Sequence, residues 1–239
     1  MNWFFGKRYP LYLFIIAIII LGLSAINVPH PDDFKLEHYP TIVFLVLLAL
    51  SYKIFRLSNI SYTLIFIFLL LHILGAHYTY SEVPYNQWFL RWFDFNLDGF
   101  FGFQRNMYDR LVHFSFGLLM YYPVRELFAR IANARGFWGL YLPLDVMMAF
   151  SMIYELAEWL IAISYGGTGV DMTYIGSQGD VWDAQKDMFL ATFGGFLTMV
   201  VVMVVNSALN KNFWKEFKDS LRIKEKKPLG EVKIQSWLK

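Results

Sequence analysis

Long apolar stretches recur along the chain up to residue 206. A helix needs about 20 apolar residues to cross the hydrocarbon core of a bilayer, and fewer where flanking side chains reach the surface. Six stretches meet or approach this length, so the pattern predicts an all-α integral membrane protein, a bundle of six transmembrane helices. The predicted helices cover residues 11–27, 41–55, 60–80, 108–127, 137–164 and 187–206.

Two segments outside these stretches combine aromatic and polar side chains. Residues 81–108 are predicted to form an interfacial aromatic loop, because aromatic rings concentrate at the membrane surface. Such rings need only anchor the bundle, and a lid over a site is the alternative. In residues 207–239, aromatic and lysine side chains recur at helical spacing from Phe213 to Leu221, which predicts a basic amphipathic tail that attracts anionic lipid. The tail is separate from a membrane domain that covers residues 1–206.

The composition agrees with a chain whose solvent is largely lipid. The chain is 57% hydrophobic, 20% aromatic and only 17% charged, and its mean hydropathy is +0.41. Soluble domains are about 45–50% apolar and about 25% charged. The lack of cysteine excludes disulfides, thiolate nucleophiles and sulfur-ligated metals. The net charge of +2 does not indicate a nucleic-acid partner, so the lipid bilayer is the expected partner.

Basic residues are unevenly distributed among the connecting segments. Sixteen of the 21 Lys and Arg residues fall on one side of the predicted bundle, nine of them after residue 206. The positive-inside rule assigns that side to the cytoplasm and places both termini there. Residues 28–40, 81–107 and 165–182 are then expected on the outer side.

Ionisable side chains inside or at the edge of membrane spans are costly and are therefore functional hypotheses. The third and fifth predicted helices run outward and carry such groups late, whereas the fourth and sixth run inward and carry them early. All four sets should meet in the outer half of the bilayer, and residues three or four apart share a helix face. The groups are His72, His77, Asp109, His113, Glu155, Glu158, Asp180, Asp183 and Asp187.

The predicted outer cluster is strongly acidic. Six carboxylates face only Arg105, Arg110 and Lys186, so protonation or a bound cation must compensate their charge. Carboxylate and imidazole donors suit a divalent zinc, iron, manganese or magnesium ion without choosing among them. The expected metal ligands are His77, Asp109, His113, Glu155, Glu158, Asp183 and Asp187.

Two other interpretations of the cluster stay open. The same groups can form a proton or ion path, or they can be salt bridges and hydrogen-bonded packing groups that hold the helices together. A carrier needs polar groups that continue to the inner face, and acids are few in the inner halves of the predicted spans, with Asp145 near the inner end of the fifth. The pattern therefore favours a site that opens outward and is closed below.

The most concrete functional prediction is a metal-dependent enzyme that acts on a lipid or cell-envelope precursor at the outer leaflet. In a hydrolase the metal activates water, and Glu158 or Asp109 is the candidate catalytic base. The sequence contains neither the GxSxG nor the HExxH motif of other hydrolases. A proton- or cation-coupled carrier and an assembly protein without chemistry are the alternatives.

Several short motifs resemble the YjdF-like bacterial inner-membrane proteins, a family of unknown function. The similarity covers about residues 10–206 and implies an integral protein of the bacterial inner membrane, but no activity. It is carried by Gly75–Tyr80, Arg105–Asn106, Tyr108–Phe114, Tyr154–Glu155, Glu158–Trp159, Gly179–Asp180, Trp182–Asp183 and Gln185–Met188.

A fainter similarity runs to the VanZ-like membrane proteins, which are linked to glycopeptide resistance. Their pattern pairs an Asp with a His four residues later, followed by an acid and by an Asp ahead of a glycine-bearing helix. Glu158 stands where a Gln is common in that family and Asp187 where an Asn is common, so the cluster in this chain is more acidic. The matching positions are Asp109, His113, Glu155 and Asp183.

Overall fold

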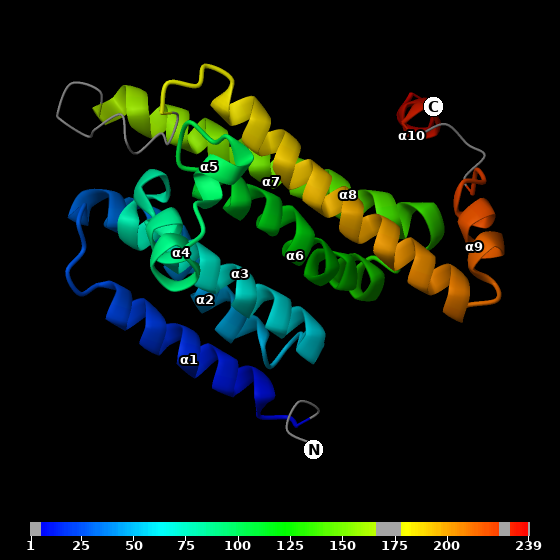
Figure 1. The fold of residues 1–239 in the computed structure, drawn as a ribbon. Coiled ribbons are helices and arrows are strands. Elements are labelled where there is room, and N and C mark those ends of the chain that lie inside the picture. Colours follow the sequence, from blue (N-terminus) through cyan, green and yellow to red (C-terminus); the bar gives the residue numbers. More distant parts are fainter. Residues whose placement is uncertain (1–5, 166–177, 225–229, 239) are drawn as a thin grey trace.

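The computed structural model describes residues 6–165, 178–224 and 230–238. Within these ranges every regular element is a helix, which confirms the all-α architecture. Six long helices form the bundle and shorter ones lie at its ends (Figure 1). The long helices are α1 (Tyr9–Ser24), α2 (Pro31–Ser51), α3 (Asn59–Tyr78), α6 (Tyr108–Ile131), α7 (Gly136–Tyr165) and α8 (Asp183–Leu209).

Four of these helices are long and apolar enough to cross a membrane by length and composition: α2, α3, α7 and α8. The other two long helices, α1 and α6, do not meet these criteria, each for a different reason. α1 is apolar but has only 16 residues, whereas α6 has 24 residues and carries charged side chains at both ends. The fold is thus that of a helical membrane protein with four candidate spans, and the count of six stays a prediction.

Several of the closest helix pairs are not consecutive in the chain. α1 packs against α3, α3 against α6, and α6 against α8, while α7 contacts both α6 and α8 and α2 contacts α3 (Figure 1). Buried apolar side chains fill the space between these helices, among them Leu69 of α3, Tyr121 of α6 and Met147 of α7. This core separates the two ends of the bundle.

α6 and α8 approach each other most closely through small residues. A Cβ atom added to Gly117 would lie 1.8 Å from the carbonyl oxygen of Ala191, and one added to Gly194 would lie 2.2 Å from that of Phe114. Close backbone contact is a principal way for helices to associate in lipid, where burial of apolar surface gives little advantage. The contact brings the polar first turns of α6 and α8 together.

The expected start of the second span at residue 41 is wrong. α2 begins at Pro31, with Asp32 and Asp33 in its first turn, so most of the predicted outer loop at residues 28–40 is helix. Proline suits the first turn of a helix and acidic side chains favour the N-terminal end of its dipole. Pro40 lies inside α2 without ending it, which is tolerated where neighbouring groups satisfy the backbone.

The aromatic segment after α3 folds into short helices. After a turn of 3-10 helix, η1 (Tyr80–Glu82), come α4 (Tyr85–Phe93) and α5 (Leu97–Phe101). None of the residues of α4 and α5 is buried, and Trp92 and Phe100 are more than 60% exposed. Exposed rings of this kind agree with the predicted place at the membrane surface.

The tail begins with a helix that docks on the bundle. α9 (Phe213–Ser220) packs against α7, and Ser220 accepts hydrogen bonds from the backbone N–H of Phe137 through Oγ and from the indole N–H of Trp138 through its carbonyl. Phe213 is buried, whereas Lys215 and Lys218 are exposed. A further helix, α10, covers Glu231–Trp237. The predicted amphipathic helix is therefore present, with Phe213 against protein and Trp214 54% exposed.

Candidate functional site

The polar ends of α6, α7 and α8 meet at one end of the bundle, as the sequence pattern predicts. Asp109 and His113 come from α6, Glu155 from α7, and Asp183 and Asp187 from α8. The α6–α8 glycine contact lies one turn below His113 and Asp187, which fixes the two helix faces against each other. We call the group formed by Asp109, His113, Glu155 and Asp187 the acid–imidazole cluster.

The donor atoms of this cluster converge. One ligand atom each from Asp109, His113 and Asp187 lies within 4.8 Å of the other two. His113 Nε2 lies 3.5 Å from Asp109 Oδ1 and 3.5 Å from Glu155 Oε1, too far for a strong hydrogen bond to either. Among the described residues Glu155 Oε1 and Asp187 Oδ1 are buried and accept no hydrogen bond. The cluster therefore contains acceptor atoms that the described protein leaves unsatisfied.

Two arginines border the cluster and engage a different carboxylate. Arg105 Nη1 lies 2.5 Å and Arg110 Nη2 2.6 Å from Asp183 Oδ1. Arg110 Nη1 also lies 3.1 Å from Asp187 Oδ1, at ion-pair distance but without hydrogen-bond geometry. Asp183 is thus neutralised by guanidinium groups, and Asp187 only in part.

Asp180 forms the outer edge of this arginine layer. It receives hydrogen bonds from Lys186 Nζ at 2.6 Å and from Arg110 Nη2 at 3.2 Å. The bond from Lys186 is the main cause that lowers the pKa of Asp180 below its usual value. A carboxylate held this way takes part in a structural ion pair.

Glu37 of α2 is a buried acid that sequence reasoning assigned to a loop. It is 4% exposed, its Oε2 accepts a hydrogen bond of 2.9 Å from the hydroxyl of Tyr154, and it interacts electrostatically with Asp109. The ring of Tyr154 contacts that of His113 edge-on, with centroids 5.7 Å apart. Tyr154 therefore links α2 to the acid–imidazole cluster.

Two histidines lie beside Glu37 in a neighbouring polar layer. His72 of α3 is hydrogen-bonded to the hydroxyls of Thr41 and Tyr80, and its ring centroid lies 6.0 Å from that of His38. His38 is 3% exposed, and its Nε2 has no hydrogen-bond partner in the described parts of the chain. Both ring nitrogens of His72 are engaged, which suits a packing role.

The other predicted site residues take different positions. His77 lies outside the converging group, and its Nδ1 is hydrogen-bonded to the carbonyl oxygen of Ser24 in α1 at 2.7 Å. Glu158, one turn after Glu155, is half-buried and interacts electrostatically with Asp109, Glu155 and Asp187. The structure brings Glu158 to the edge of the cluster and His77 to the α1–α3 contact.

Comparison with known proteins agrees with this architecture. Residues 9–208 match the family described as "Predicted membrane protein (DUF2238)". The chain belongs to this family. It is also 33% identical over 183 residues to the inner membrane protein YjdF of Escherichia coli (strain K12), a match that covers 76% of this chain and 83% of that protein. No solved structure matches the chain. The resemblance to YjdF-like proteins is therefore confirmed, and the similarity to VanZ-like proteins stays a prediction.

The sequence pattern did not predict that Asp33, Glu37 and His38 are buried helix residues, because it placed residues 28–40 in an outer loop. The available signal was Pro31 followed by two acidic residues, a pattern typical of a helix start. From such a start, Asp33 and Glu37 are four residues apart and share a face. Members of the DUF2238 family can be examined for this polar face on the second helix.

Proposed function

We propose that this protein binds one divalent cation in the acid–imidazole cluster, with Asp109, His113, Asp187 and Glu155 as ligands. The observation that carries the proposal is the convergence of buried donor atoms, of which Glu155 Oε1 and Asp187 Oδ1 accept no hydrogen bond in the described structure. Buried polar atoms are normally satisfied, and a bound ion is one of the recognised explanations for exceptions. A divalent cation also offsets the excess of carboxylate charge.

The spacing of the donors supports the same proposal. Two ligand atoms that each lie about 2.1 Å from a tetrahedral metal are about 3.4 Å apart. The two distances of 3.5 Å from His113 Nε2 to Asp109 Oδ1 and to Glu155 Oε1 match this edge length. We leave His77 and Asp183 out of the proposed ligand set, because Ser24 engages the first and two arginines engage the second.

We further propose that the bound metal supports hydrolysis of a lipid or of a lipid-linked envelope precursor. The metal supplies Lewis-acid activation of a water molecule. Glu158 would accept a proton from the water whose oxygen adds to the substrate, and would return that proton to the leaving group when the substrate bond breaks. The position of Glu158 beside the cluster, outside the proposed ligand set, supports its assignment as the base.

The apolar core below the cluster supports an enzyme more than a carrier. On the faces below His113, the bundle is filled by Met120 and Tyr121 of α6 and by Met147 of α7, all buried. A carrier needs a polar route through this region. Among the described residues these side chains close the site on that side.

The proposed location is the bacterial inner membrane, with both termini in the cytoplasm and the cluster facing outward. The inner-membrane relative from Escherichia coli and the 16 of 21 basic residues on one side support this orientation. The exposed lysines of α9 are then proposed to contact anionic lipid of the inner leaflet.

Metal analysis of the purified protein tests the first proposal. Wild-type protein prepared without chelators should contain close to one zinc, iron or manganese ion per chain, and His113→Ala and Asp187→Asn should lose it. Asp180→Asn is the matched control, because it removes a nearby carboxylate that is engaged by Lys186 and Arg110. A magnesium ion would instead raise the melting temperature of the wild type alone on addition. The proposal would be overturned if the wild type contained no metal and its melting temperature did not respond to magnesium.

Catalysis has a separate test. Metal-loaded protein in liposomes made from a bacterial inner-membrane lipid extract should convert one lipid species to hydrolysed products detectable by mass spectrometry. Glu158→Gln should keep its metal and lose this conversion. Loaded wild-type protein that consumes no lipid would contradict the enzyme proposal and leave the metal site standing.

A further inference from the structure

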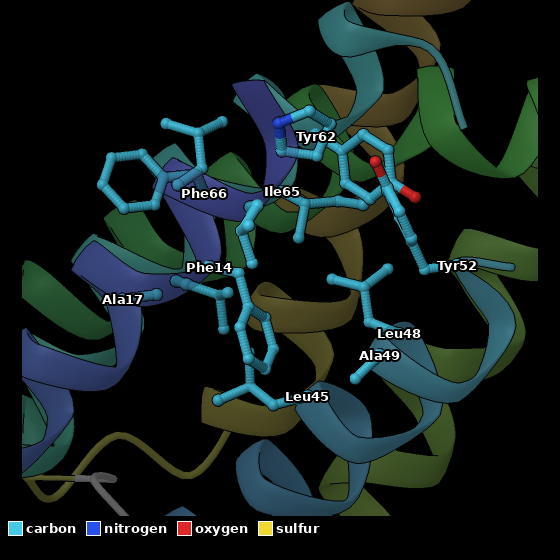
Figure 2. Close-up of a pocket in the computed structure, with 13 residues that line it drawn as sticks. Phe14, Ala17, Leu45, Leu48, Ala49, Tyr52, Tyr62, Ile65 and Phe66 are labelled. Atoms are coloured by element: carbon cyan, nitrogen blue, oxygen red, sulfur yellow. The ribbon is translucent and has the colours of Figure 1, made fainter. Parts of the chain in front are cut away.

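An apolar pocket lies at the opposite end of the bundle from the acid–imidazole cluster. It has a volume of about 180 Å³ and is lined by side chains from α1 and α3, and from α2 and the residue that follows it. Figure 2 shows Phe14, Leu45 and Ile65 pointing into the same space. α1 and α2 each pack against α3, and the pocket lies between them.

The pocket is open to the lipid-facing surface of α1 and α2. Leu11, which lines it, is 50% exposed, and Ala49 on α2 is also exposed. At the depth of the hydrocarbon core the molecules available to fill such an opening are acyl chains. A dry cavity of about 150 Å³ holds a benzene-sized group, so this pocket has room for a segment of one chain.

Positive charge gathers at one end of the pocket. The Tyr52 hydroxyl, at that end, donates a hydrogen bond of 2.9 Å to the carbonyl oxygen of Lys7. This contact joins the start of α1 to the residue that follows α2, so Lys7, Arg8 and Lys53 all belong to this end of the pocket. All three side chains are exposed, and in the described structure none of them forms an ion pair. Free cations at a helix end attract the phosphate of anionic lipids.

We infer that this pocket is a binding site for one anionic glycerophospholipid. One acyl chain lies between α1 and α2, and the phosphate contacts Lys53 together with Arg8 or Lys7. The combination of a lipid-open apolar pocket with unpaired cations at its end favours this occupant over a second protein helix, which would not need the charges. The site is independent of the metal site, because the apolar core separates the two.

Retained lipid in the purified protein provides the test. Wild-type protein washed in mild detergent should carry one phosphatidylglycerol molecule in native mass spectra, after incubation with equal amounts of phosphatidylglycerol and phosphatidylcholine. Ala49→Trp fills the pocket from an exposed position and should remove the retained lipid. Val46→Trp is the matched control, because Val46 is a lipid-exposed residue of α2 that does not line the pocket.

The charge contribution is tested by a second pair of variants. Lys53→Gln combined with Arg8→Gln should reduce the preference for phosphatidylglycerol over phosphatidylcholine at least tenfold. Lys35→Gln is the control, since Lys35 lies near the other end of α2 and pairs with Asp32. Retention that is unselective, or equal in Ala49→Trp and Val46→Trp, would indicate only bulk annular lipid and would overturn the inference. Metal content should be unchanged in all of these variants.

Discussion

Two buried glutamates at opposite ends of the bundle differ in how fully their carboxylates are hydrogen-bonded. Glu126, near the end of α6, accepts hydrogen bonds from the backbone N–H of Ser58, from the hydroxyl of Ser61 and from Arg130. Glu155 of α7 is about as buried, with 9% of its side chain exposed against 13% for Glu126, yet its Oε1 accepts none from the described residues. Glu126 completes a helix connection, whereas Glu155 Oε1 is left for the cation that we propose.

The other charged groups at the two ends of the bundle differ in the same way as the two glutamates. At the Glu126 end, Glu126 is fully hydrogen-bonded and Lys7, Arg8 and Lys53 are exposed, although Arg125 Nε is buried without a partner among the described residues. The pocket beside them is apolar. At the Glu155 end, carboxylates and imidazoles are buried together and only partly compensated by Arg110. Burial without full compensation is costly, which makes the second end the candidate for function.

The largest expected effect is an all-or-none difference in accessibility between the two ends. A single cysteine at Gln87, in α4 near the acidic end, should react with a membrane-impermeant thiol reagent in intact cells. One at Ala132, at the end of α6, should react only after permeabilisation. Both native residues are exposed and the chain has no cysteine of its own. Equal labelling of the two positions would disprove the proposed orientation.

The next effect concerns the arginines at the two ends. Arg110→Gln leaves buried Asp187 without a cationic partner and Asp183 with Arg105 alone, and should lower the free energy of unfolding by about 3–5 kcal/mol. Arg130→Gln removes an ion pair to Glu126 in which the arginine is 45% exposed, and should cost about 1 kcal/mol or less. Thermal unfolding in detergent measures both. Similar losses for the two variants would show that the ends are not electrostatically different.

The third effect is the change in stability when either glutamate is replaced by glutamine, which should be a loss at Glu126 and no loss at Glu155. Glu126→Gln loses charge-assisted hydrogen bonds and should destabilise the protein by about 1.5–3 kcal/mol. Glu155→Gln removes a charge that the metal-free protein does not compensate, so its melting temperature in chelator should equal or exceed that of the wild type. Its stabilisation by added metal should be weaker. A destabilised Glu155→Gln in chelator would indicate a structural role for this acid as well.

The smallest effect is the pH dependence of Asp180. Its pKa is depressed below the ordinary value of 3.8, chiefly by the hydrogen bond from Lys186. A depressed carboxylate stabilises the folded state above the unfolded pKa, and this contribution disappears as the pH falls through the folded pKa. The wild type should therefore melt slightly above Asp180→Asn at pH 6, and the two melting temperatures should converge below about pH 4. A difference that persists at low pH would point to a cause other than charge.

Hydropathy predicted most of the helical architecture because the bilayer demands long apolar helices wherever the chain crosses it. The long helices after α2 begin and end within a few residues of the predicted spans. The start of α2 was missed because Asp33, Glu37 and His38 lower its hydropathy. In the structure these residues are buried in a helix that packs against α3, and Tyr154 of α7 donates a hydrogen bond to Glu37.

For the site, the sequence by itself determined the residue types and, through helix direction, that Asp109, His113, Glu155 and Asp187 meet at one end. Tertiary structure alone decided which of them remain unsatisfied. Asp183 forms ion pairs with two arginines, and His77 is hydrogen-bonded to a carbonyl oxygen of α1. Glu37 accepts a hydrogen bond from Tyr154, although hydropathy placed its part of α2 in a loop. The physical reason is that periodicity fixes which face a side chain occupies, whereas its partner depends on the distances at which neighbouring helices pack.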